Sequence, residues 1–97
     1  MIKINKSSFR SWLKNNQKLK FRPSNYCYCP LATFLTIKSG KVYKVGKTIC
    51  WTENMTLGVH LMPDELPQWA IDFVEKIDKS EAEYVTSTRC LKILEQV

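Results

Sequence analysis

Apolar residues recur at the three- and four-residue spacing of a helix face in three separate stretches, and this pattern constrains the fold most. The stretches are Phe9 to Leu13, Leu31 to Leu35 and Trp69 to Ile77. Side chains at this spacing lie on one face of an α-helix, so each stretch predicts a helix that buries that face. A fourth helix is predicted to begin at Thr86 or Ser87, which follow a run of poor helix formers.

Residue types that favour helix ends set the limits of the first two predicted helices. Ser7 or Ser8 can cap the first helix with its side-chain oxygen. The second helix is predicted to begin at Cys29 or Pro30, because proline lacks the N–H that a first helical turn leaves unpaired. Gly40 fits the end of that helix.

The segment between the second and third predicted helices has the composition of β-structure. The runs "KVYKV" and "KTICW" are rich in β-branched and aromatic residues and predict two strands. Gly46-Lys47 between them matches a Gly-X hairpin turn, and residues 57–62 offer another short strand. We therefore expect an α+β fold, with about four short helices and a small antiparallel hairpin or sheet between helices two and three. The 97 residues suit a single domain, 1–97.

Charge is unevenly distributed along the chain. Residues 1–52 contain eleven lysines and arginines and no acid, whereas residues 53–97 contain nine acids and four bases. The first part therefore carries +11 and the second −5, which together give the net charge of +6. Such asymmetry indicates an acidic partner for the first part, most commonly nucleic acid. The alternative is that the two parts face each other and partly neutralise, with the remaining charges solvated.

Basic and aromatic residues alternate within the acid-free part. Lys18, Lys20 and Arg22 would project from one side of residues 17–22 if that segment is extended. Further along the chain, Tyr26 and Tyr28 offer rings for stacking on unpaired bases, and further lysines recur at every third residue. The candidate residues for binding nucleic acid or another acidic partner are Lys18, Lys20, Arg22, Tyr26, Tyr28, Lys41, Lys44 and Lys47.

The four cysteines raise two chemical alternatives. Zinc is the first, but only Cys27 and Cys29 are close in sequence, and structural zinc sites use two close pairs. A cysteine hydrolase is the second, with Cys29 at a helix start and His60 as its base. Packing explains Cys50 and Cys90, because free cysteine is among the most buried residue types. We expect no metal, no cofactor and no catalytic residue.

Three segments together resemble a group of small proteins of unknown activity that bacteria and their phages encode. These segments are "CPLATFL", "LPQWAIDFVEKID" and "VTSTRCLKIL", and the similarity covers Cys29 to Leu94. The resemblance implies a Cys-Pro-Leu-Ala helix, a Leu-Pro-x-Trp-Ala helix and a short closing helix. It also implies a second function class, since small phage proteins often inhibit host machinery, as anti-CRISPR proteins do.

The leading hypothesis is a small non-enzymatic binding protein whose basic N-terminal half engages RNA, DNA or a nucleoprotein complex. The alternatives are an anti-CRISPR-like inhibitor that binds a host defence protein, and a hydrolase that uses Cys29 and His60. The sequence has no apolar run of membrane-spanning length and no apolar signal core at its start, so we expect a cytoplasmic protein that does not bind membranes.

Overall fold

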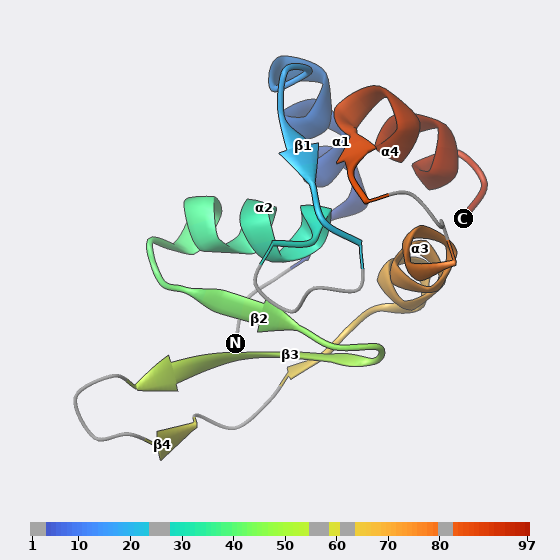
Figure 1. Cartoon of the computed structure of the whole chain (residues 1–97). Helices are drawn as coiled ribbons and strands as arrows, with labels where there is room; N and C mark the ends of the chain where they lie inside the picture. The colour runs from blue at the N-terminus through green and yellow to red at the C-terminus, as the bar shows by residue number, and fades with distance from the viewer. Residues whose placement is uncertain (1–3, 24–27, 55–58, 61–63, 80–82) are drawn as a thin grey trace.

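The fold was analysed in a computed structural model that describes residues 4–23, 28–54, 59–60, 64–79 and 83–97. These residues form four helices and six short strands, so the expected α+β class is confirmed (Figure 1). The helices are α1 (Lys6–Asn15), α2 (Pro30–Ser39), α3 (Gln68–Asp78) and α4 (Ser87–Leu94). The strands are β1 (Lys20–Phe21), β2 (Tyr43–Val45), β3 (Ile49–Asn54), β4 (Val59–His60), β5 (Asp64–Glu65) and β6 (Val85–Thr86).

Side-chain caps fix the starts of three helices. The predicted cap of α1 is wrong by two or three residues: Asn5 is the cap, and its side chain accepts a 3.0 Å hydrogen bond from the Ser8 N–H. The predicted start of α2 is confirmed, because the Cys29 Sγ accepts from the Ala32 N–H at 3.3 Å. Thr86 caps α4 as predicted and accepts from the Arg89 N–H.

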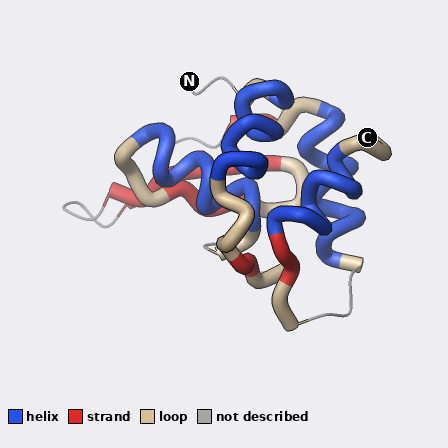
Figure 2. The backbone as a smooth tube through the Cα atoms, turned by 90° about the horizontal axis from the view of Figure 1, so that it is seen from above, coloured by secondary structure: helices blue, strands red, loops and turns tan. Residues whose placement is uncertain are grey.

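The strands between α2 and α3 form a four-stranded antiparallel sheet, which confirms the small antiparallel sheet predicted at this place. β3 is its middle strand and pairs with β2, β4 and β5. Strand β5 comprises two acidic residues that the sequence pattern did not mark as a strand. Helix α2 runs beside β2 on one side of this sheet, with α1 and α4 further from it (Figures 1 and 2).

The hairpin turn between β2 and β3 differs from the predicted Gly46-Lys47 turn. The Gly46 N–H donates to the Ile49 carbonyl at 2.8 Å, so the two-residue turn is Lys47-Thr48. Gly46 is the residue before that turn, and a Cβ built there would lie 3.3 Å from the Trp51 ring. The glycine is therefore used for close packing of Trp51, and not for a turn conformation.

A second sheet joins segments from the two ends of the chain. Strand β1 pairs antiparallel with β6, with Lys20 opposite Thr86 and Phe21 opposite Val85. Ser87, at the start of α4, adds a 2.7 Å hydrogen bond from its hydroxyl to the Asn16 carbonyl at the end of α1. Both contacts hold the C-terminal helix against the N-terminal one.

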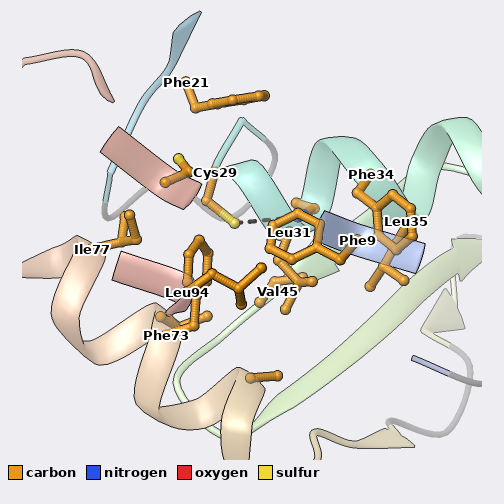
Figure 3. Close-up of a cluster of buried hydrophobic side chains, with 14 of the residues drawn as sticks. Phe9, Phe21, Cys29, Leu31, Phe34, Leu35, Val45, Phe73, Ile77 and Leu94 are labelled. Atoms are coloured by element: carbon orange, nitrogen blue, oxygen red, sulfur yellow. Dashed lines mark hydrogen bonds between the residues drawn. The ribbon is translucent and has the colours of Figure 1, made fainter. Parts of the chain in front are cut away.

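Aromatic rings form the centre of the core. Phe9 is fully buried, and its ring lies 5.2 Å from the rings of Phe34 and Phe73 and 6.0 Å from that of Trp69. One side chain of α1 thus contacts both α2 and α3 (Figure 3). Trp12 extends the cluster to β1, with its ring 5.8 Å from that of Phe21.

The lengths of the four helices bear on the expectation that the chain does not enter a membrane. The longest described helix, α3, has 11 residues. Within the part of the chain that the structure describes, no helix has the length and apolarity needed to cross a membrane.

The left-handed residue that ends α2 gives a stability prediction. Gly40 has φ +74°, and no atom lies within 4 Å of a Cβ built there, so Gly40→Ala brings backbone strain without a clash. We expect this variant to lose about 1–2 kcal/mol of unfolding free energy. The midpoint of thermal unfolding, followed by circular dichroism, should fall by roughly 4–8 °C for each kcal/mol lost. Gly40→Asn is the control and should lose less, because asparagine tolerates this conformation; equal stability of all three proteins would contradict the prediction.

Candidate functional site

An open hollow of about 510 Å³ lies where β1 meets the segment before β6. We call it the tyrosine hollow; the lining residues used below are Leu19, Lys20, Phe21, Arg22, Tyr28 and Tyr84. They come from three separate parts of the chain: β1 and its flanks, the residue before Cys29, and the residue before β6. The hollow therefore exists only in the folded protein.

Alternation along β1 decides which side chains reach this surface. Phe21 is buried at 2% exposure against the core, while its neighbours Lys20 and Arg22 are exposed. Adjacent residues of a strand point to opposite faces, so burial of Phe21 turns both bases outward. The Arg22 N–H also donates a 3.1 Å hydrogen bond to the Tyr28 carbonyl, which holds Tyr28 beside β1.

Arg22 and Tyr84 form a specific pair in the tyrosine hollow. The guanidinium Nη2 of Arg22 donates to the Tyr84 hydroxyl at 3.1 Å, and its Cζ lies 5.4 Å from the centre of the tyrosine ring. This hydrogen bond is the main reason that the pKa of Arg22 is raised above its ordinary value. The Tyr84 side chain remains 45% exposed, and that of Tyr28 is 64% exposed. The positively charged guanidinium of Arg22 and the exposed rings of Tyr28 and Tyr84 therefore lie on one surface.

A second hollow of about 550 Å³ adjoins the first at Leu19. Its lining includes Lys14 at the end of α1 and Lys18 in the turn that follows. Residues 16–18 form this turn, closed by the Leu19 N–H donating to the Asn16 carbonyl, so Lys18 does not continue the alternation of β1.

The two hollows together form what we call the basic–aromatic face. Its candidate binding side chains are Lys14, Lys18, Lys20, Arg22, Tyr28 and Tyr84. Among the described residues that line the two hollows there are four bases and no acid. Glu83, next to Tyr84, is the acid whose charge acts on Arg22.

The other predicted lysines lie elsewhere and do not gather into one cluster. Lys41 follows α2 and Lys47 is in the β2–β3 turn, so they lie at opposite ends of β2 (Figure 1). Lys47 lines a separate hollow of about 390 Å³ with Glu75 and Asp78 of α3 and with Lys79, which forms an ion pair with Glu75. Bases and acids therefore meet at that hollow. This agrees with the alternative in which residues 1–52 and 53–97 face each other and their charges partly neutralise. Lys44 lies in β2, opposite Trp51.

The cysteines in the described part of the chain are buried. Cys29, Cys50 and Cys90 are at most 5% exposed. Burial, together with the nearby Asp64 carboxylate, raises the pKa of Cys50 to about 11, and burial raises that of Cys90 to about 12. Both thiols therefore stay protonated at neutral pH, as core residues would. Tyr26 and Cys27 lie outside the described residues.

The fold separates the elements that carry Cys29 and His60. Cys29 lies at the start of α2, whereas β4, which carries His60, lies at the far end of the sheet (Figure 1). The Cys29 thiol is directed into its own helix, where it accepts from the Ala32 N–H (Figure 3). For metals, the described residues contain no group of three histidine, cysteine or acidic side chains close enough to hold an ion.

Tyr84 is a side chain of the candidate site that the sequence did not indicate. It lies more than 60 residues from Arg22 along the chain and outside the basic part, in a segment interpreted only as unfavourable for a helix. Only the pairing of β1 with β6 brings it to the site. Comparison with protein-family models, curated proteins and solved structures gave no significant match.

Thiol reactivity tests the packing interpretation of the cysteines. In a Cys27→Ser variant, we expect iodoacetamide at pH 8 to label Cys29, Cys50 and Cys90 slowly, because all three are buried and burial raises the pKa of Cys50 and Cys90. Mass spectrometry of a labelling time course gives the rate at each residue, and the same protein in guanidinium chloride is the control. Rapid labelling of Cys29 alone in the folded protein would instead indicate an activated nucleophile.

Proposed function

We propose that this protein binds nucleic acid through the basic–aromatic face and acts without catalysing a reaction. We place this activity in the cytosol. The support is one observation: exposed bases and exposed aromatic rings converge on adjoining hollows whose described lining contains no acid. Lysines at such a surface neutralise phosphates and release counterions, which supplies affinity for any sequence.

The chemistry of the face favours phosphate and base contacts over a protein partner. Arg22 has its guanidinium over an aromatic ring, and exposed rings stack on bases of any sequence. Contacts of this kind position a nucleic acid but read little of its sequence. We therefore propose binding that depends strongly on salt and weakly on sequence.

Removing two lysines tests the role of the face. We expect the double variant Lys18→Gln, Lys20→Gln to bind a labelled oligonucleotide more weakly, because each lysine neutralises one phosphate. The slope of log K against log salt, from fluorescence anisotropy titrations between 50 and 200 mM NaCl, should become shallower by roughly 1 for each lysine.

A charge-matched variant is the control for this test. Lys76→Gln, Lys79→Gln removes the same charge from the C-terminal end of α3 and the residue that caps it. The ion pair that it breaks, Lys79 with Glu75, is largely exposed and so contributes little stability. This variant should retain the slope of the unchanged protein. If both double variants lost affinity for the oligonucleotide equally, binding would depend on the net charge of the protein and not on this face.

A pull-down from bacterial lysate separates the proposed function from an anti-CRISPR-like inhibitor. With the unchanged protein as bait, nuclease treatment should release the captured material if nucleic acid is the ligand. A protein that stays bound after nuclease treatment, and that Lys18→Gln, Lys20→Gln does not release, would favour inhibition of a host protein and overturn the proposal.

A further inference from the structure

The tyrosine hollow contains two positions at which a flat group can stack. The first is the Tyr28 ring, which is 64% exposed beside β1. The second is the guanidinium of Arg22, which Tyr84 holds from one side through its ring and its hydroxyl. Aromatic rings, tyrosine among them, and guanidinium planes are surfaces on which proteins stack unpaired bases.

Tyr84 restrains the position of the Arg22 guanidinium. A contact with a phosphate does not require such restraint. A hydrogen bond from Nη2 and a ring beneath Cζ together restrain the long, flexible side chain. Restraint of this kind lowers the entropy that stacking would otherwise cost. A phosphate contact would need only the charge, which the neighbouring Lys20 already supplies at the same hollow.

The described elements at this face are poorly suited to a duplex. Bases in a duplex are already stacked and present only their edges in the grooves, which proteins read with an inserted helix or a two-stranded ribbon. Here the rings line an open hollow around two-residue strands, and the ends of α1 and α4 lie beside it. Rings in such a hollow can contact base faces only where the bases are unpaired.

We propose that the ligand is single-stranded nucleic acid, with one base stacked on Tyr28 and another on Arg22 backed by Tyr84. The strand continues past Leu19 toward Lys18 and Lys14, where the adjoining hollow places its phosphates. This inference rests on the proposed function, because it names the ligand class of the same face. It adds Tyr84 and assigns Arg22 a stacking role in addition to its charge.

Arg22→Lys provides the sharpest test, because it keeps the positive charge and removes the planar guanidinium group on which a base would stack. We expect it to bind a 12-nucleotide single strand about tenfold more weakly, with the salt slope unchanged, because stacking does not release counterions. Tyr28→Ala should behave in the same way, whereas Tyr28→Phe, which keeps the ring, should bind like the unchanged protein. Unfolding midpoints of each variant, measured by circular dichroism, check that the fold is intact.

The ligands in this experiment distinguish the inference from the proposed function. Anisotropy titrations use single-stranded RNA, single-stranded DNA, the matching duplexes and an abasic strand of the same length. The inference predicts tighter binding of either single strand than of duplex or abasic strand, and the two single strands show whether RNA or DNA is preferred. Equal binding of duplex, abasic and single strands, or Arg22→Lys binding like the unchanged protein, would overturn the inference and leave the proposed function standing. No binding of any of them would overturn both.

Discussion

Burial of Phe9 is the interaction on which the rest of the arrangement depends. Its ring meets Phe34 of α2 and both Trp69 and Phe73 of α3, so one side chain of α1 contacts two other helices. An aromatic ring of this size contributes more apolar burial than most other side chains of a small core. In a 97-residue chain few such contacts are available, and this one joins α1 to both α2 and α3.

The candidate site is a consequence of that core and not an addition to it. Trp12 lies one helical turn beyond Phe9 and contacts Phe21, which fixes the inward residue of β1. Once Phe21 points inward, alternation turns Lys20 and Arg22 outward on either side of it. The same residue that completes the core therefore determines which charges face the solvent.

The separation of charge along the sequence does not correspond to a separation of charge on the surface of the folded chain. The acid-free half does not form one basic surface, because Lys47 lies near Glu75 and Asp78 while Lys20 and Arg22 lie at the tyrosine hollow. Part of the positive charge of the first half thus lies at a hollow that acids of the second half also line. Lys20 and Arg22 are exposed, and they lie beside the exposed rings of Tyr28 and Tyr84.

The sequence by itself determined the local elements of this protein. Apolar spacing located the helices, Pro30 and Gly40 bounded α2, and β-branched residues marked the hairpin, because each of these signals acts within a few residues of the chain. Lys20, Arg22 and Tyr28 could be named as candidates, since alternation and composition are local properties.

Only the tertiary structure decided which of these residues meet. The pairing of β1 with β6 joins residues more than 60 positions apart, and two-residue strands leave too weak a pattern to reveal it. Tyr84 therefore could not be assigned to the site beforehand, and Lys47 could not be separated from it. Which distant segments meet depends on how the whole core packs, and no stretch of sequence contains that information alone.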